Sequence, residues 1–154
     1  MGNNIYHLDE IEKFNNLISE DKKIVFTNGC FDLLHLGHIE LLKFCRKKGD
    51  FLVVGLNSDR SVKTLKGSLR PILDIETRAV ILSSLEFVDM VVIFDEETPF
   101  NLIDKLAPDI LVKGGDYKPE EIVGSDIAGK TLIFPFVENA GTTNIIKTIT
   151  DRYC

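Results

Sequence analysis

The chain has 154 residues, and its 24 acidic against 18 basic side chains give a net charge of −6 with the histidines neutral. This length suits a single domain, 1–154, that buries most of the surface its unfolded chain would expose. The acidic excess argues against a broad nucleic-acid-binding surface, which needs a cationic excess, so any phosphate-binding charge must be local. Three cysteines without a CxxC pair argue against a disulfide scaffold or a zinc knuckle and fit a reducing compartment.

The N-terminal segment and the apolar runs bear on location. Residues 1–20 are polar and acidic rather than basic and then apolar, so no secretory signal peptide is expected. No apolar run approaches the ~20 residues that cross a bilayer. We therefore expect a cytoplasmic protein with neither a membrane nor a nucleic acid as a partner.

Apolar and β-branched runs alternate with helical patterns along the whole chain. A lead-in helix is predicted over 7–19, within a lead-in segment 1–22, and a core follows over 23–151. In that core the expected strands are 23–27, 51–56, 90–94, 110–112 and 131–134, and the expected helices are 38–48, 74–85, 98–106 and one that Thr142 or Thr143 caps. This order predicts an α/β fold: one Rossmann-like domain with a doubly wound, mostly parallel five-stranded sheet and helices on both faces.

Ligands of such sheets bind beyond the carboxyl ends of the strands. The loops after the first, second, fourth and fifth predicted strands contain residues 35–38, 57–59, 113–117 and 139–143, which are rich in His, Asn, Asp, Lys, Gly and Thr. All four loops therefore fall on the same edge of the predicted sheet.

Residues 35–38, His-Leu-Gly-His, lie where the first strand gives way to a helix. The N-terminus of a helix presents free N–H groups and a partial positive charge. Gly37 has no side chain to block the close approach of a phosphate. A capping or core role is the alternative for the two histidines, but the spacing, the glycine and the location favour a phosphate site.

The segment 60–71 follows the second strand and contains no acid but four basic side chains, Arg60, Lys63, Lys66 and Arg70. We expect a mobile, anion-binding loop, because a Gly-Ser pair at 67–68 allows movement. An ordinary solvated loop is the alternative. Arg78, on the next helix, is expected to point to the same place, unless it pairs with Glu76 or Asp74.

Two further loops suggest ligand contacts. Residues 141–143, Gly-Thr-Thr, offer hydroxyl and N–H groups to a second anion, although an ordinary N-cap explains them as well. The two glycines of 113–116 permit close approach to a flat ring, and Asp116 offers an acceptor; a surface turn is the alternative. Cys30 lies in the motif loop but lacks the partners of a nucleophile, so packing is the simpler interpretation.

Residues 29–38, GCFDLLHLGH, contain the HxGH pattern of the nucleotidyltransferase superfamily related to cytidylyltransferases, which this chain resembles. Further segments look like the heptose 1-phosphate adenylyltransferase group, namely 57–59, 66–67 with 70–71, 113–119 and 142–146. Together these motifs cover residues 24 to 149. In several cytidylyltransferases an arginine precedes the hydroxyl cluster, whereas 134–139 contains none, which disfavours the cytidylyl branch.

The resemblance implies transfer of AMP from ATP to D-glycero-D-manno-heptose 1-phosphate, giving pyrophosphate and ADP-heptose, a precursor of lipopolysaccharide or capsule. Mg²⁺ is expected to arrive with the nucleoside triphosphate, without dedicated protein ligands. The expected catalytic residues are His35, His38, Lys66 and Arg78. The expected nucleotide-binding residues are Asn28, Gly29, Cys30, Phe31, Gly37, Lys113, Gly114, Asp116, Thr142 and Thr143. The expected sugar phosphate-binding residues are Asp32, Asn57, Asp59, Lys63 and Arg70.

Two alternatives stay open. One is a cytidylyltransferase or guanylyltransferase that acts on another sugar phosphate or on glycerol 3-phosphate. The other is a non-catalytic nucleotide-binding module. A separate sugar kinase is expected in the pathway, because only one short predicted helix precedes residue 24, and a homodimer is an assembly that the sequence leaves open.

Overall fold

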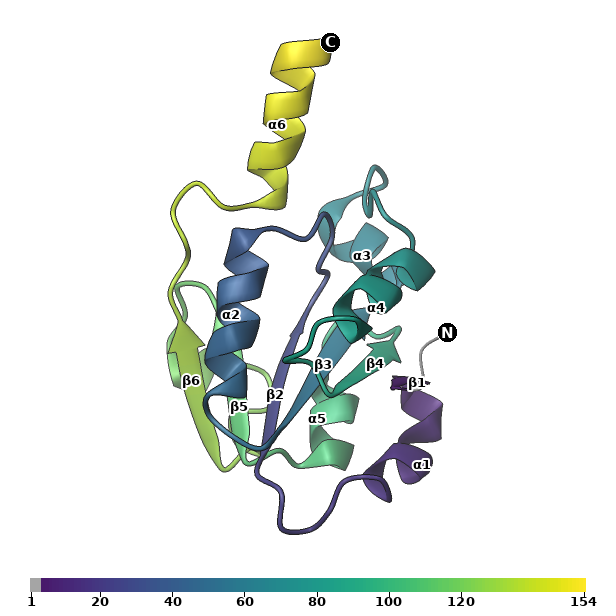
Figure 1. Ribbon diagram of the computed structural model, residues 1–154, viewed down its shortest axis with the longest axis vertical. Helices are drawn as coiled ribbons and strands as arrows, with labels where there is room; N and C mark the ends of the chain where they lie inside the picture. Colours follow the sequence, from purple (N-terminus) through teal and green to yellow (C-terminus); the bar gives the residue numbers. More distant parts are fainter. Residues whose placement is uncertain (1–3) are drawn as a thin grey trace.

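The computed structural model describes residues 4–154, and in this part of the chain six parallel strands form one sheet in the order β1-β4-β3-β2-β5-β6 (Figure 1). The strands are β1 (Ile5–His7), β2 (Ile24–Gly29), β3 (Phe51–Asn57), β4 (Met90–Phe94), β5 (Ile110–Gly114) and β6 (Lys130–Phe134). The predicted parallel α/β domain is confirmed, with one strand more than expected.

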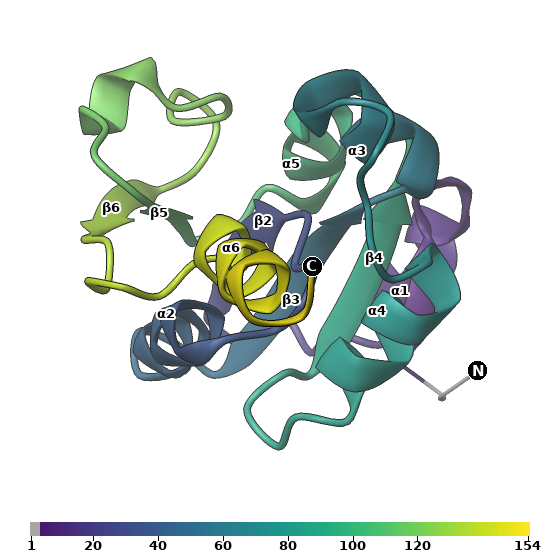
Figure 2. The same cartoon turned by 90° about the horizontal axis from the view of Figure 1, so that it is seen from above.

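Helices cover both faces of this sheet (Figure 2). They are α1 (Ile11–Asn15), α2 (Leu36–Arg46), α3 (Asp59–Lys66), α4 (Ile75–Ser83), α5 (Phe100–Leu106) and α6 (Thr142–Tyr153), with 3-10 turns η1 (Leu8–Glu10) and η2 (Pro119–Glu121). Leu42 of α2 and Leu82 of α4 pack on one face of the sheet, and Phe14 of α1 and Ile103 of α5 pack on the other. Because helices pack on both faces of the sheet, a ligand can reach the strands only at their ends.

The sheet reverses its winding at β2. The chain runs from β2 to β3 and then to β4 on one side, and β5 returns to the other side of β2, where Val25 pairs with Ile110. A reversal of this kind opens a crevice beyond the carboxyl ends of the two neighbouring strands, which is where ligands of doubly wound sheets bind. The HLGH segment follows β2 and therefore starts beside this crevice.

The N-terminal segment differs from the expected helix over 7–19. Residues 5–7 form the edge strand β1, in which Ile5 pairs with Val91 of β4, and the helical pattern then gives only η1 and α1, ending at Asn15. A strand of three residues is too short to show the alternation that identifies a strand. The first three residues of the predicted 1–22 segment lie outside the described residues.

The first half of the expected mobile loop at 60–71 is the helix α3. Ser58 caps it by accepting the N–H of Ser61 at 3.1 Å, Val62 is fully buried, and Gly67 ends it with a φ of +98°. Basic residues are good helix formers. The prediction of a loop was therefore wrong for residues 60–66, which belong to a short amphipathic helix.

Helix α6 extends away from the rest of the domain (Figures 1 and 2), and none of its residues is buried. Gly141 is its N-cap residue, so the expected side-chain cap from Thr142 or Thr143 is not formed. The Thr142 hydroxyl instead donates to the main-chain carbonyl of Asp32 at 2.7 Å. None of the helices described, from α1 to α6, is long and apolar enough to cross a membrane.

Candidate active site

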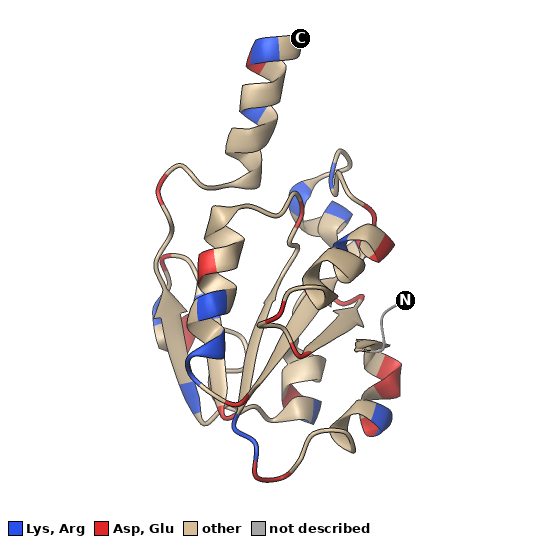
Figure 3. Cartoon of the chain, viewed as in Figure 1, with Lys and Arg blue, Asp and Glu red and all other residues tan. Residues whose placement is uncertain are grey.

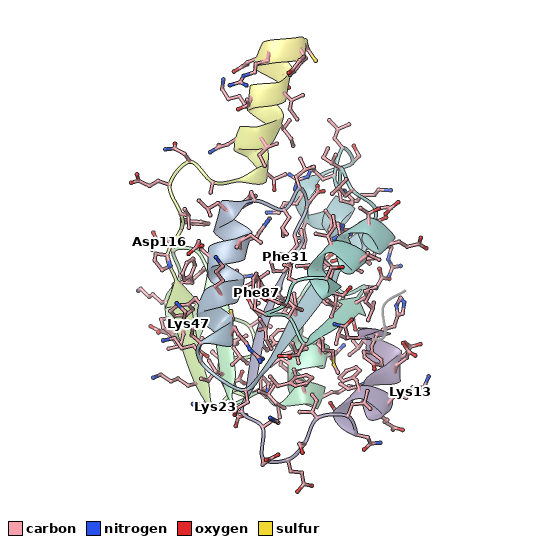
Figure 4. The ribbon with its side chains drawn as sticks, in the orientation of Figure 1. Lys13, Lys23, Phe31, Lys47, Phe87 and Asp116 are labelled. Atoms are coloured by element: carbon pink, nitrogen blue, oxygen red, sulfur yellow. The ribbon has the colours of Figure 1, made fainter. Side chains whose placement is uncertain are left out.

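A cavity of about 740 Å³ opens at the carboxyl edge of the sheet and is lined from all four loops that the sequence singled out. The predicted site residues that line it are His35, His38, Lys66, Asn28, Gly29, Cys30, Phe31, Gly37, Lys113, Gly114, Thr142, Thr143, Asp32, Asn57 and Arg70. The predicted residues that do not line it are Asp59, Lys63, Arg78 and Asp116. Asp116 is exposed on the outer side of the loop after β5 (Figure 4).

The two motif histidines are fixed by the first turn of α2, which begins at Leu36. His35 is the N-cap residue, and its Nδ1 accepts the N–H of Gly37 at 3.1 Å. The main-chain N–H of His35 in turn donates to Nδ1 of His38 at 3.4 Å. The two rings are stacked, with their centroids 3.7 Å apart. Main-chain N–H groups thus fix both imidazole rings through their Nδ1 atoms.

The pKa values and hydrogen bonds of the pair define one tautomer. Burial lowers the pKa of His38 to about 3, with the neighbouring His35 lowering it further and Asp32 opposing the shift. Burial also lowers the pKa of His35. Both rings are therefore neutral at pH 7, and because each Nδ1 accepts a hydrogen bond, each Nε2 carries the proton. The site offers two Nε2–H donors rather than an imidazolium.

The loop before the histidines is closely packed and strained. Phe31 and Leu33 have φ angles of +46° and +49°, a conformation that is costly for residues other than glycine. The Phe31 ring belongs to the core layer of α2 and α4 (Figure 4), and its centroid lies 5.1 Å from that of His38. A Cβ at Gly37 would lie 3.0 Å from the His35 ring, so a larger residue there would require the ring to move.

Asp32 lines the cavity, but its carboxylate is taken up by hydrogen bonds from the chain itself. Its fully buried carboxylate accepts hydrogen bonds from Arg70 Nε at 2.7 Å and from the N–H groups of Ile72 and Leu73 at 2.7 and 3.0 Å. Burial raises the pKa of this carboxyl, but the three donors outweigh burial and hold the pKa below its ordinary value. These hydrogen bonds secure the loop after α3, and they occupy the carboxylate that the sequence assigned to sugar phosphate.

Arg78 is fully buried and does not reach the cavity. Its guanidinium donates to the carbonyls of Leu73, Cys30 and Asn57 at 3.0, 2.7 and 2.9 Å, and it pairs with Asp59 at 2.7 Å. It therefore joins the loops after β2 and β3 to the start of α4, and Asp59 is its counter-ion. The expectation that Arg78 points toward the phosphates is wrong for this structure, because main-chain carbonyls take up its donors.

Asp74 does not pair with Arg78 either. It caps α4, as predicted, by accepting the N–H of Thr77 at 2.8 Å. Figure 3 shows Lys and Arg on α3 and on the loop that follows, at the upper edge of the sheet, and also on α2, on α6 and at the lower edge of the domain.

Lys66 and Lys113 both line the cavity. Their ammonium groups have no hydrogen bond or ion pair among residues 4–154. Burial lowers the pKa of Lys113, opposed by Cys30 and reinforced by the nearby Lys66 ammonium. Burial likewise raises the pKa of the Cys30 thiol, against the charges of Lys66, Arg78, Arg70 and Lys113. Cations that are close together without a counter-ion favour the binding of an anion between them.

Some residues that line the cavity were missed. Tyr117 and Phe136 are 49% and 75% exposed, and a Cβ at Gly115, whose φ is +132°, would lie 2.7 and 3.2 Å from their rings. Glu97 and Glu121 also line the cavity, in the loops after β4 and β5. Tyr117 lies in the 113–117 loop that the sequence singled out but was given no role, whereas Phe136 and the two acids look like ordinary loop residues in the sequence.

A parallel α/β domain with neutral imidazole donors, the start of a helix and unpaired cations at its switch point belongs to the class of proteins that bind the phosphates of nucleotides. Comparison with known families agrees with this class. The chain belongs to the cytidylyltransferase-like family, whose model matches residues 26–140.

Curated relatives extend the comparison. The chain is 57% identical over 153 residues to the bifunctional protein HldE of Campylobacter concisus, and 53% identical over 152 residues to that of Aliarcobacter butzleri. These matches cover 97% and 98% of this chain but 32% of each relative, so the chain spans about a third of the length of the curated relatives it matches.

Solved structures give the same fold. The lipopolysaccharide core biosynthesis protein of Thermoplasma volcanium superposes with a TM-score of 0.65 at 32% identity, over 76% of this chain and 99% of that one. A pantoate-beta-alanine ligase of Francisella tularensis superposes with a TM-score of 0.60 over 85% of this chain and 66% of the ligase, and at 17% identity this likeness concerns the fold alone.

Proposed function

We propose that this chain transfers AMP from ATP to D-glycero-D-manno-heptose 1-phosphate and releases pyrophosphate. The observation that carries the proposal is the cavity that both motif histidines, each fixed through Nδ1, line together with the unpaired cations Lys66 and Lys113. Relatives at 53–57% identity that are named bifunctional protein HldE, and a structural neighbour named for lipopolysaccharide core biosynthesis, support the sugar-phosphate branch.

The reaction suits a site without a nucleophile–base pair. A sugar 1-phosphate has a second pKa of about 6, by analogy with phosphoserine, and is largely dianionic at neutral pH. One of its oxygens attacks the α-phosphorus of the nucleoside triphosphate, the bond to the bridging oxygen breaks, and pyrophosphate leaves. The barrier is repulsion between anions and the charge that builds on the leaving group, so the protein contributes position and positive charge.

The described residues divide this work. His35 and His38 donate from Nε2 to phosphate oxygens whose charge grows in the transition state. Lys66 and Lys113 bring charge to the cavity, and Arg70, held by Asp32, brings a third cation. Because the main chain fixes each ring through Nδ1, these donors are in place before the reaction begins.

Magnesium is the expected companion of the triphosphate. No group of three or more His, Cys, Asp or Glu side chains within residues 4–154 is placed to hold a metal ion, and the carboxylate of Asp32 is already occupied. Such a site fits an ion that is held by the phosphate oxygens themselves. When bound with the nucleotide, Mg²⁺ would neutralise part of the triphosphate charge.

The curated relatives are about three times as long as this chain and are named as bifunctional. The sugar kinase expected from the sequence is therefore proposed as a partner activity that lies outside these 154 residues.

A substrate panel tests the proposal. Pyrophosphate release is measured with ATP, CTP, GTP and UTP, each against heptose 1-phosphate, a hexose 1-phosphate and glycerol 3-phosphate. We expect ATP to exceed the other nucleotides about tenfold or more in kcat/KM, because an unmatched donor or acceptor on the base costs about 1–3 kcal/mol. Equal or faster turnover with CTP would contradict the adenylyl assignment, and no turnover with any pair would contradict the transferase itself.

A further inference from the structure

The cavity is lined by carboxylates as well as by cations. Glu97 lies after β4 and Glu121 ends η2, and both side chains are exposed toward solvent and line the cavity. In the described part of the chain neither carboxylate has a hydrogen bond or an ion pair. The hydroxyl-bearing Thr98 lines the cavity beside Glu97. We call Glu97, Thr98 and Glu121 the acidic wall.

Helix α5 brings the two parts of the acidic wall to the same side. Glu97 and Thr98 lie just before its first residue, Phe100. On the same helix Ile103 packs so closely against the backbone of Gly124 that a Cβ there would lie 2.7 Å from it. Ile122, which follows Glu121, is buried in the same apolar cluster as Ile103. The positions of both acids are thus set by the packing of one helix.

Hydrogen bonds link the acidic wall to the end of β3. Asn57 Nδ2 donates to Ser61 Oγ at 2.9 Å, and Ser61 Oγ donates to the main-chain carbonyl of Glu96 at 2.8 Å. Asn57 is buried and lines the cavity as well. Glu96, the residue before Glu97, is therefore fixed next to the end of β3. Asn57, which the sequence assigned to the acceptor, lies at this end of the site, whereas Thr142, which it assigned to the nucleotide, belongs to α6.

Charge decides which part of a ligand can lie here. Carboxylates repel phosphate oxygens, which Lys66 and Arg70 attract, but they accept hydrogen bonds from hydroxyl groups, and these charge-assisted bonds are strong. Leu65, Pro99 and Val123 also line the cavity, with apolar surface. Apolar surface next to hydrogen-bond acceptors complements a sugar, which presents C–H groups as well as O–H groups.

We propose that the acidic wall binds the hydroxyl groups of the acceptor, so that Glu97, Thr98 and Glu121 select a polyhydroxylated phosphate ester. The inference rests on the proposed function and extends it from the reacting phosphates to the rest of the acceptor. The phosphate of the acceptor lies against Lys66 and Arg70, and its sugar extends toward the carboxylates.

The test uses the variants Glu97→Gln and Glu121→Gln, with Glu120→Gln as the matched control. Glu120 is exposed next to Glu121 but does not line the cavity. Neither of the tested carboxylates has a partner within the described chain, so thermal unfolding should show all three variants to be as stable as the unchanged protein. Pyrophosphate release is measured while heptose 1-phosphate is varied at saturating ATP, and while ATP is varied at saturating heptose 1-phosphate.

We expect KM for the acceptor to rise about tenfold or more in each tested variant, the scale of losing a hydrogen bond to a charged group. KM for ATP should stay within about twofold, the control should match the unchanged protein, and the preference for heptose 1-phosphate over a hexose 1-phosphate should narrow. An unchanged acceptor KM, or an equal rise in KM for ATP, would overturn the inference while the proposed function stands. No turnover in the unchanged protein would overturn the proposed function, and the inference with it.

Discussion

The tautomer assigned to the histidine pair has a thermodynamic consequence that can be measured without any substrate. Burial holds the pKa of His38 near 3 in the folded protein, whereas a histidine in the unfolded chain titrates at about 6.5. Because the folded pKa is the lower one, this residue's contribution to stability is complete above about pH 6.5 and is lost as the pH falls. Between these two pKa values, His38 is protonated in the unfolded chain but not in the folded protein.

The magnitude follows from the two pKa values. Between about pH 7.5 and pH 5 the unfolded histidine goes from mostly neutral to almost fully protonated, which corresponds to about 2 kcal/mol of lost unfolding free energy. Over this range the folded ring stays neutral, so the result depends little on the exact folded pKa. A loss of this size is a large fraction of the stability of a small domain.

The perturbation is His38→Asn, whose side-chain oxygen can take the place of Nδ1 and accept the N–H of His35. Urea unfolding of both proteins is followed at several pH values over this range. The packing lost on substitution shifts the whole curve, so only the pH dependence is compared. We expect the unchanged protein to lose about 2 kcal/mol more than the variant on acidification. Parallel pH profiles would refute the buried, neutral state of His38.

Three further predictions concern turnover and the loop after α3. His35→Ala should lower kcat about 10²-fold or more, with a smaller effect on KM for ATP, because it removes a donor that acts on the transition state; a folded variant with normal kcat in the pyrophosphate assay would contradict this role. Lys66→Ala should reduce turnover, whereas Lys63→Ala, outside the cavity, should not, and equal effects in the same assay would contradict the distinction. Asp32→Asn should speed hydrogen exchange at the amides of 72–73, which the carboxylate now binds, and unchanged exchange would show that the loop is held by other contacts.

The parts of the fold that the sequence predicts well are those with a strong local pattern. Residues 51–56 and 90–94 are nearly continuous apolar runs, and both are buried strands of the parallel sheet. The HLGH segment lies between a strand and a helix, as expected, because the strand pattern before it and the helical pattern after it are both local. Placing the loops on one edge then follows from parallel topology alone.

The parts that the sequence does not predict depend on partners far apart in the chain. Asp32 binds the amides of Ile72 and Leu73, about 40 residues away, and no spacing rule connects them. Arg78 looks like a free cation in a basic region until its carbonyl partners are known. A net positive segment indicates where an anion could bind, but only the geometry shows which of its cations already have partners.

The helix α6 projects from the domain with few tertiary contacts, and its first turn supplies Thr142 and Thr143 to the cavity. A helix of this length gains little stability from its own hydrogen bonds in water. Part of the cavity lining therefore belongs to an element with little stability of its own, which the Thr142 hydroxyl joins to the motif loop through the carbonyl of Asp32. For the proposed nucleotide site, this links ligand affinity to helix formation: we expect the apparent dissociation constant to rise in proportion as the population with a formed α6 falls, and a bound nucleotide to stabilise the helix in return.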